Sequence, residues 1–216
     1  MSNVAVNTDQ STEESPEARL VQSQPSVGHQ LGIAVGLLLV FTFITGVVYP
    51  LLVTGIGQVF FSDKANGSLV VQGDKVVGSR LIGQPFEDPK HFWSRLSATS
   101  PAAYNSGLSS GSNFGPTNEA LTKASQARVD ALREADPGNT APIPVDLATA
   151  SGSGLDPHIS LAAAEYQMAR VARTRGLPET RVRELVAANT EGRDLGILGE
   201  PRVNVLMLNL ALDAAR

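Results

Sequence analysis

A long apolar run near the N-terminus constrains the fold more than any other feature of this sequence. No Asp, Glu, Lys or Arg occurs from Leu20 to Ser62. Within that stretch Leu31–Val53 reads LGIAVGLLLVFTFITGVVYPLLV. About 20 residues of helix cross the core of a bilayer. The run therefore predicts one transmembrane helix, which we place with its extension at residues 29–61.

Two other interpretations of the apolar run fit its sequence less well. A core helix of a soluble domain would carry a polar face, which this run lacks. A cleaved signal peptide would have a basic start and a shorter apolar core. Here the leader is acidic and the run continues through Tyr49-Pro50, so the sequence favours an uncleaved signal-anchor. Residues 1–28, rich in Ser, Gln, Glu, Asn and Pro, predict a disordered tail.

The predicted membrane helix contains residues that interrupt it or let another helix approach. Pro50 lacks a backbone N–H, so we expect a kink or the end of the regular helix there. Gly32, Gly36 and Gly46 leave flat positions for helix packing, and Gly32-x-x-x-Gly36 matches the small-xxx-small pattern. A single span forms no pore by itself, so a transport role requires partners.

Charge and composition exclude several classes of function. From Asp63 onward the chain has 17 acidic and 16 basic residues. A nearly neutral domain of this kind lacks the positive field that attracts nucleic acid, so the sequence argues against nucleic-acid binding. Cysteine is absent, which excludes disulfides and thiolate sites. The three histidines are scattered and predict no zinc site. Lys and Arg near the two ends of the membrane helix are balanced, so charge does not decide its orientation.

The remaining residues, 62–216, predict a small α+β domain with strands early and helices late. Leu69–Gln72 and Lys75–Val77 flank Gly73-Asp74 as in a hairpin whose second strand could extend to Gly83. Phe92-Trp93 is expected in the core, and the Gly-, Pro- and hydroxyl-rich segment 101–116 predicts a loop.

Capping residues mark the helices of this domain. Asn118 is the expected N-cap of a helix that runs to Ala135. Residues 142–150 have strand-type composition. Asp156-Pro157 predicts the start of a helix that ends before Gly176. Further helices are expected from Pro178 to Ala188 and from Val203 to Ala215.

Sequence motifs for catalysis are weak. There is no P-loop sequence and no Asp-Lys-Thr-Gly phosphorylation sequence. Gly107-Leu-Ser109-Ser-Gly111 fits the G-x-S-x-G motif of serine hydrolases, but that motif requires a strand–turn–helix elbow, which its neighbours do not predict. A membrane-anchored serine hydrolase remains the third hypothesis.

Two loops motivate a second hypothesis, direct nucleotide binding. Ser151–Gly154 is a Gly-rich loop before a predicted helix N-terminus, a generic anion site, although Asp156 would occupy the phosphate position. Residues 108–112 (LSSGS) resemble the LSGGQ loop of ABC ATPases only loosely.

Several longer segments together resemble the C subunit of the bacterial Kdp potassium-transporting ATPase. The resemblance covers nearly everything from the membrane helix to the C-terminus, and its last two segments are long and specific. Leu96 and Ser110 depart from the family's usual Arg-Pro-Ser-Ala and Ser-Gly-Gly-Ser-Asn. The segments are Gly78–Gln84, Phe92–Arg95, Gly111–Asn118, Asp146–Ser160 and Leu195–Leu206.

The resemblance implies a non-catalytic accessory subunit in a complex that imports potassium at high affinity by ATP hydrolysis. Its implied partners are a channel-like potassium-binding subunit, a P-type ATPase subunit and a small membrane peptide. It implies roles in assembly and in raising the ATPase subunit's affinity for ATP. It also implies a single-pass protein of the bacterial plasma membrane with a cytoplasmic N-terminus and the domain outside. A domain outside the cell could affect the affinity for cytosolic ATP only allosterically.

For the domain we therefore expect interface residues, with no catalytic residue, no metal and no tightly bound cofactor. ATP is the ligand that the resemblance implies. Potassium is the ion that the complex would transport. Loops and helix ends concentrate function. The candidates for a partner interface or a ligand loop are Arg95, Ser97, Ser109, Ser112, Asn113, Asp156, His158, Glu200 and Arg202. For membrane packing they are Gly32, Gly36, Gly46 and Pro50.

Overall fold

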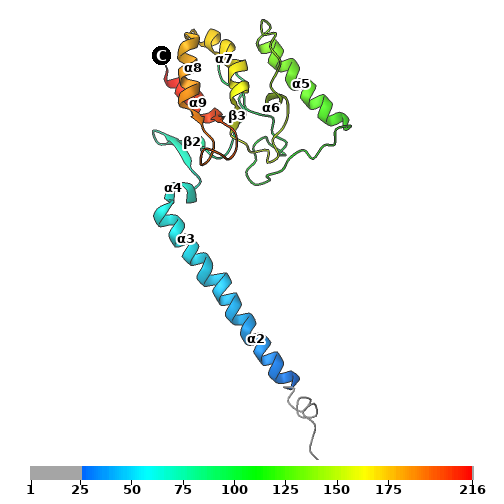
Figure 1. Cartoon of the computed structure of the whole chain (residues 1–216), viewed down its shortest axis with the longest axis vertical. Coiled ribbons are helices and arrows are strands. Elements are labelled where there is room, and N and C mark those ends of the chain that lie inside the picture. Colours follow the sequence, from blue (N-terminus) through cyan, green and yellow to red (C-terminus); the bar gives the residue numbers. More distant parts are fainter. Residues whose placement is uncertain (1–25, 216) are drawn as a thin grey trace, which may run out of the picture. The chain divides into compact units, whose positions relative to one another are not determined.

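The computed structural model describes residues 26–215, which divide into two compact units with the boundary between Ser62 and Asp63 (Figure 1). The first unit is an apolar helix, and the second is a domain of helices and two small sheets. The predicted α+β class with one N-terminal membrane helix is confirmed. The predicted tail lies outside the described residues, except that Ser26 caps the helix and Val27 and Gly28 begin it.

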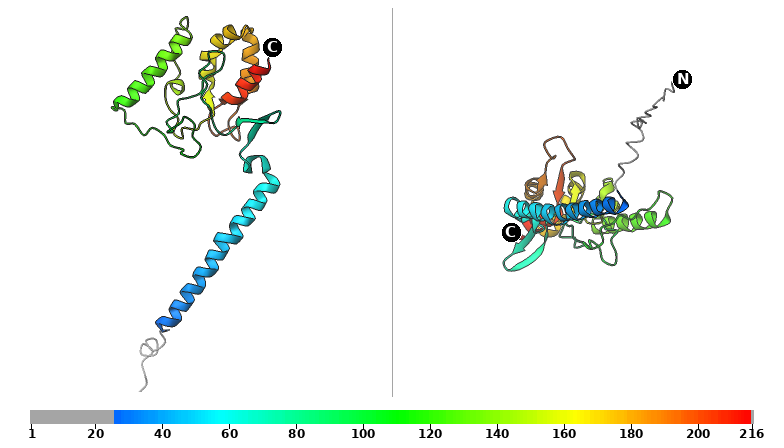
Figure 2. Two further views of the ribbon diagram at one scale, coloured as in Figure 1. Left: turned by 180° about the vertical axis from the view of Figure 1, so that it is seen from behind. Right: turned by 90° about the horizontal axis from the view of Figure 1, so that it is seen from below.

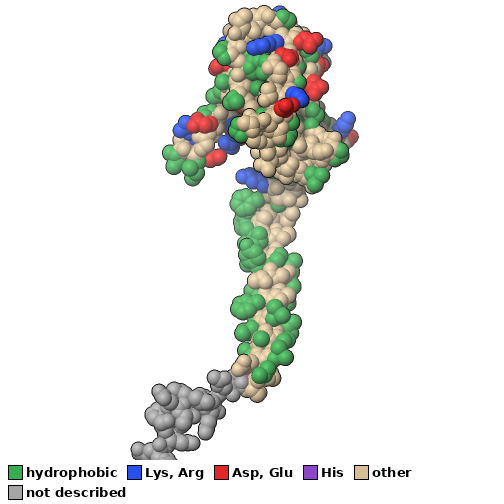
Figure 3. All heavy atoms as spheres, turned by 90° about the vertical axis from the view of Figure 1, so that its right-hand side faces the viewer, with side chains coloured by type: hydrophobic (Ala, Val, Ile, Leu, Met, Phe, Trp, Pro, Cys, Tyr) green, Lys and Arg blue, Asp and Glu red, His purple; other side chains and the backbone are tan. Residues whose placement is uncertain are grey.

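The first unit is a continuous helix from Val27 to Phe60 that is long and apolar enough to cross a membrane. It consists of α2 (Val27–Phe43), a π-helical segment η1 (Ile44–Val48) and α3 (Tyr49–Phe60). Its 18-residue window reaches a mean hydropathy of 2.5, and none of that window is buried within the chain. Figure 3 shows apolar side chains along its length, as expected for a surface that faces lipid or other helices.

The helix does not end at Pro50, which corrects one of the two expected outcomes. Immediately before it, the Tyr49 N–H donates to the Ile44 carbonyl, five residues back, and the Thr45 hydroxyl donates to the Phe41 carbonyl at 2.6 Å. Pro50 lies at the start of α3, directly after the π-helical segment, whose wider turn accommodates a residue that has no N–H to donate. The helix therefore continues to Phe60.

The second unit begins with a short helix and a hairpin. Helix α4 (Ser62–Ala65) leads to β1 (Leu69–Gln72), which pairs antiparallel with β2 (Lys75–Ser79). The predicted hairpin is confirmed, with Gly73 in the left-handed region at φ +59°. The second strand ends at Ser79 and does not reach Gly83, because the Ser79 hydroxyl turns to the Gly67 carbonyl and accepts from the Leu81 N–H.

A three-stranded antiparallel sheet forms the centre of the domain, in the order β3-β5-β4. Its strands are β3 (His158–Ser160), β4 (Thr190–Glu191) and β5 (Arg202–Asn204). Helices α7, α8 and α9 lie side by side near it, and α5 lies on the other side of the domain (Figure 1). Their bounds, with that of the short α6, are α5 (Glu119–Ala135), α6 (Val145–Ala148), α7 (Leu161–Arg175), α8 (Glu179–Ala188) and α9 (Val205–Ala214).

Local capping signals were reliable at several helix ends. The Asn118 side chain accepts from the Ala120 N–H at 2.9 Å and caps α5, which ends at Ala135 as predicted. Gly176 ends α7 in the left-handed conformation at φ +65°, as predicted for a C-terminal glycine. Helix α8 follows Pro178 and ends at Ala188, again as predicted.

Three elements differ from the prediction. Within residues 142–150, Val145–Ala148 form the short helix α6 and not a strand, because Asp146 on its first turn accepts from the Ser160 N–H and hydroxyl, a contact outside local sequence. Asp156-Pro157 does not begin α7: His158–Ser160 pair with β5 first, and the Ser160 hydroxyl caps the helix by accepting from the Ala163 N–H at 3.0 Å. Likewise, β5 pairing delays the last helix to Val205.

Phe92-Trp93 is buried in the core, as predicted, and is held like a strand by two side-chain amides. Asn209 of α9 accepts from the Phe92 N–H at 2.9 Å and donates to its carbonyl at 3.0 Å. Gln167 of α7 accepts from the Trp93 N–H at 2.7 Å and donates to its carbonyl at 3.2 Å. These bonds satisfy the buried backbone of a segment that has no sheet partner.

Two guanidinium groups lie over the Trp93 ring. Arg128 of α5 stands 4.8 Å from the ring centroid, and Arg170 of α7 stands 5.1 Å from it. Arg170 is itself buried and donates to the Pro89 and His91 carbonyls. Burial lowers the pKa of Arg170 to about 10, so it stays charged at neutral pH. The ring thus joins α5 to α7 across the segment that leads into the candidate site.

Candidate functional site

Two irregular segments, residues 95–114 and 150–156, lie against each other and form what we call the loop platform. The Ser97 hydroxyl is its centre: it donates to the Gly154 carbonyl at 2.6 Å and accepts from the Tyr104 N–H at 2.9 Å. The Tyr104 hydroxyl returns to the Arg95 carbonyl at 2.6 Å. A candidate residue chosen for function thus serves first to fix the backbone of both segments.

Glycines allow the two segments to approach this closely. Gly154 has φ +68°, and a Cβ there would lie 2.6 Å from the Thr99 methyl and 2.7 Å from the Ser110 carbonyl oxygen. A Cβ on Gly111 would lie 2.9 Å from the Gly152 carbonyl oxygen. Neither backbone can move away without breaking the contact, so the platform depends on glycine at these positions.

A chain of charged side chains runs from the platform across the three-stranded sheet. Arg95 Nη1 lies 3.0 Å from Asp156 Oδ2, and the other Asp156 oxygen accepts from the His158 N–H at 3.0 Å. The two nitrogens of the His158 ring each lie 3.5 Å from a carboxylate, one of Asp156 and one of Glu191. Glu191 continues to Arg202 Nε at 3.1 Å. Four of the predicted residues are therefore brought together, with Glu191 as a link that was not predicted.

The environment of Asp156 keeps it ionised. Burial acts to raise its pKa, but hydrogen bonds from His158 and the positive charge of Arg95 outweigh burial and lower the pKa. Tyr104 behaves oppositely, because burial raises the pKa of its phenol and keeps it neutral. The Arg95–Asp156 ion pair thus joins the two segments of the platform next to the start of β3. Asp156 is already engaged by these partners and does not present a free carboxylate.

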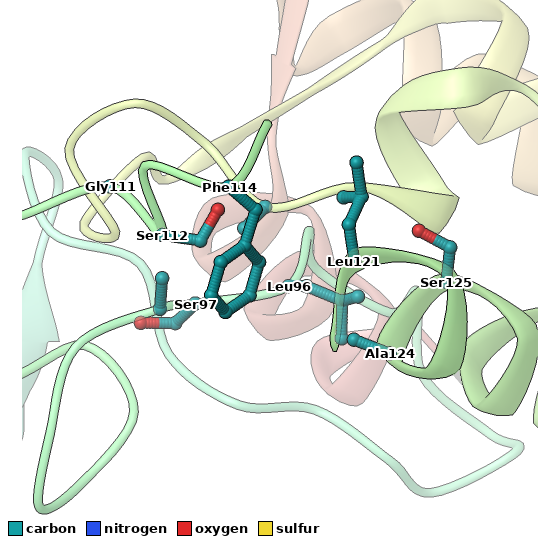
Figure 4. A pocket seen from close by; sticks show the side chains of 10 residues that line it. Leu96, Ser97, Gly111, Ser112, Phe114, Leu121, Ala124 and Ser125 are labelled. Atoms are coloured by element: carbon teal, nitrogen blue, oxygen red, sulfur yellow. The ribbon is translucent and has the colours of Figure 1, made fainter. Parts of the chain in front are cut away.

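Beside the platform lies a groove of about 340 Å³, shown in Figure 4. One wall is α5, which contributes Leu121 and Ala124, and the other is the platform, which contributes Leu96, Ser97 and Ser112. The Phe114 ring lies between these two walls (Figure 4). Small, apolar and hydroxyl-bearing residues make up the whole lining, which is completed by Ala98, Gly111, Ser125 and Ala150.

The lining of this groove indicates the chemistry it can support. None of its residues is Lys, Arg, Asp, Glu or His, so a triphosphate would meet no positive charge there. An apolar groove with a few hydroxyls suits an apolar side chain of a protein partner. In the part of the chain that the structure describes, no group of three His, Asp or Glu side chains is arranged to hold a metal ion.

The other candidate residues lie elsewhere or outside the groove. Ser109 is exposed, donates to the Ser153 carbonyl at 3.1 Å, and has neither a strand nor a helix in residues 101–118 around it, so the hydrolase elbow is not formed. Asn113 is exposed at φ +49°. Glu200 pairs with Arg193 at 2.8 Å in the β4–β5 loop. Ser151–Gly154 leads into β3 and not into a helix, which removes the expected anion site.

Several residues of the site were not predicted. Leu96, Phe114 and Leu121 form the groove, Tyr104 supports the platform, and Glu191 joins His158 to Arg202. Leu121 lies in the helix that was predicted after Asn118, but its place in the groove was not predicted. Tyr104 bonds Arg95 and Ser97 within an irregular loop, and Glu191 meets His158 from a separate strand, so neither residue belongs to a periodic local pattern.

Comparison with known proteins agrees with the resemblance seen in the sequence. The family model for the K+-transporting ATPase, c chain, matches residues 31–214. A potassium-transporting ATPase KdpC subunit of Methylococcus capsulatus is 68% identical over 180 residues, 83% of this chain and 95% of the relative. That of Sorangium cellulosum is 64% identical over 183 residues, 85% of this chain and 96% of the relative. This chain therefore belongs to the KdpC family, the C chains of the potassium-transporting ATPase.

Proposed function

We propose that this chain is a non-catalytic accessory subunit of an ATP-driven, high-affinity potassium importer. In this role it supports assembly of the complex and raises the ATPase subunit's affinity for ATP from a distance. The proposed partners are a channel-like potassium-binding subunit, a P-type ATPase subunit and a small membrane peptide. Family membership supports the coarse role, and the features of the domain support the finer one.

The groove beside the loop platform carries this proposal. Its lining is apolar and hydroxyl-bearing, with no charged side chain to meet phosphates. Of the neighbouring charges, Arg95 pairs with Asp156 and Arg202 pairs with Glu191, and the His158 ring lies 3.5 Å from each of these two carboxylates. A site of this composition favours docking of a protein over binding of ATP or hydrolysis of a substrate.

We further propose that the chain spans the bacterial plasma membrane once, with its N-terminus in the cytoplasm and its domain outside. In that orientation the domain has no access to cytosolic ATP. Any effect on ATP affinity must then be a coupling free energy, transmitted through the membrane helix and the partner subunits. The exposed apolar helix Val27–Phe60, with Gly32, Gly36 and the π-helical segment, offers a surface for such partners.

ATP binding to the full chain and to the complex tests this function. The full chain in detergent should show no saturable binding of labelled ATP at concentrations that saturate the complex. The complex prepared without this chain should need more ATP for half-maximal hydrolysis. Saturable binding to the chain alone would favour a direct nucleotide-binding subunit, and an unchanged ATP dependence would exclude the affinity role.

A further inference from the structure

The loop between β4 and β5 presents a compact group of aliphatic side chains to solvent. Leu195 is 88% exposed, Ile197 75% and Leu198 57%. Figure 2 shows this loop projecting from the domain near α8 and α9. Loops of this size usually carry polar residues at their tips. We call residues 195–198 the apolar knob.

Internal hydrogen bonds hold the apolar knob in one shape. Asp194 and Leu198 exchange backbone hydrogen bonds at 2.8 and 2.9 Å, and the Gly196 N–H donates to the Arg193 carbonyl at 3.1 Å. Leu195 is held at φ +54°, a conformation that a residue with a Cβ seldom adopts. Glycines at 196 and 199 take the other two positive φ values of the turn.

This combination is unfavourable for the isolated domain. The strained backbone of this loop keeps three aliphatic side chains exposed to water, which does not stabilise the domain. Backbone strain and exposed apolar patches of this kind are common at functional sites. Pre-ordering the tip lowers the entropy cost of binding something that buries it. The knob therefore has the properties of a preformed anchor, with a few apolar side chains that enter a pocket.

The charges around the apolar knob distinguish between two occupants. Arg193 is paired with Glu200 at 2.8 Å, and Arg202 is shared between Glu191 at 3.1 Å and Asp194 at 3.6 Å. Residues 190–202 contain three carboxylates, two guanidinium groups and no Trp or Tyr. Segments that insert into a bilayer surface usually carry free basic residues and interfacial aromatics, which this loop lacks. Residues 190–202 are net negative and their charges pair with one another, which fits a socket on a protein better than a membrane surface.

We infer that the apolar knob is an anchor that inserts Leu195, Ile197 and Leu198 into an apolar socket on another subunit of the potassium pump. This inference rests on the proposed function and deepens it, because it names the surface through which the domain engages its partner. The socket is apolar at its floor, and its rim offers hydrogen-bond donors or basic groups to Asp194 and Glu200.

Site-specific photo-crosslinking tests the inference in the intact complex. A photo-reactive phenylalanine analogue replaces Ile197, or Val145 of α6 as the control, since Val145 is 74% exposed and apolar but distant in sequence. Illumination of membranes that contain the complex should join position 197 to a pump subunit, identified by mass spectrometry, at several times the yield from position 145. Adducts with lipid or with a second copy of this chain, or equal yields from both positions, would overturn the inference.

A matched pair of substitutions gives the functional measure. Ile197→Asn should lower recovery of the complex about tenfold relative to Val145→Asn, with the folded state of each chain checked by the fluorescence of Trp93. Equal recovery would overturn the knob inference and leave the proposed function intact. Failure of the unsubstituted chain to co-purify with any pump subunit would instead contradict the proposed function itself.

Discussion

Replacing Asn209 by Leu should destabilise the domain, because it removes both hydrogen-bond partners of a buried backbone segment. The Asn209 side chain makes both hydrogen bonds of the Phe92 backbone, at 2.9 Å to its N–H and 3.0 Å to its carbonyl. Asn209 is 1% exposed and Phe92 is fully buried, so water does not replace the lost partner. Leu has the branched skeleton of Asn with a larger volume, and it leaves the N–H and the carbonyl of Phe92 without partners.

The expected size follows from these two groups. A buried donor or acceptor without a partner costs about 1–3 kcal/mol. Two such groups cost about 2–6 kcal/mol, and the added apolar contacts of Leu offset part of it, so we expect a loss of about 2–4 kcal/mol. A domain is stable by about 5–15 kcal/mol in total, so the variant should still fold.

Trp93 provides the assay, because it is the only Trp of the chain and lies in the same buried segment. Urea unfolding of the full chain in detergent, followed by Trp93 fluorescence, gives the free energy of unfolding. Gln126→Leu is the control, since Gln126 is exposed and bonds only the Asp130 side chain at 2.8 Å; it should change stability by less than about 0.5 kcal/mol. A loss for Asn209→Leu no larger than that of the control would show that the Asn209 amide does not stabilise the buried backbone of Phe92.

Three further predictions concern the site. Asp156→Asn should destabilise the domain at neutral pH. The pKa of Asp156 in the folded domain lies below 3.8, so its ionised form stabilises the fold. The difference in stability between the variant and the unsubstituted chain should therefore shrink as the pH falls from about 3.8 through that lower pKa. Gly154→Ala should cost about 1–3 kcal/mol of stability, since its φ is +68° and a Cβ would meet the Ser110 carbonyl oxygen, whereas Gly138→Ala, with open space, should not. Leu121→Glu should weaken co-purification with the other pump subunits about tenfold by charging the groove, whereas Thr122→Glu should not.

Each of these has a measurement that decides it. Unfolding midpoints measured across pH test the prediction for Asp156. A difference between Asp156→Asn and the unsubstituted chain that stays constant down to pH 2 would show that ionised Asp156 does not stabilise the fold. Thermal unfolding compares the two glycine variants, and equal midpoints would show that the platform tolerates a Cβ. Quantitative pull-down through a tagged ATPase subunit tests the groove, and equal recovery of both glutamate variants would mean that no partner occupies it.

The features predicted from sequence are those whose cause is local. The membrane helix follows from an apolar run that no soluble element requires, and Asn118 and Gly176 end their helices through bonds made within a few residues. The burial of Phe92-Trp93 was expected from the apolar character of the pair, although the side chains that hold its backbone, Asn209 and Gln167, come from distant helices. At the helix ends the residues that supply the free energy are neighbours in the chain, so reading the chain in order finds them.

The errors arise where a distant segment supplies the partner. Asp156 has the sequence of a helix cap, but Arg95, 61 residues away, takes its carboxylate, and pairing of β3 with β5 keeps His158–Ser160 extended. Ser160, a residue equally able to cap, then begins the helix. The groove depends in the same way on the approach of the loop platform to α5. Its two walls, Leu121 and Ala124 on α5 and Leu96, Ser97 and Ser112 on the platform, are 9 to 28 residues apart in sequence, which no local pattern reports.

The side of the membrane on which the domain lies decides most directly whether this domain acts through partner contacts and not on ATP. Because the chain has no cysteine, a single Cys at the exposed position Ala127 of α5 gives an unambiguous label site. Labelling by an impermeant maleimide in intact cells, equal to that in lysed cells, is the predicted result. Protection in intact cells, with full labelling only after lysis and a denatured control to exclude burial, would put the domain beside cytosolic ATP and contradict the account.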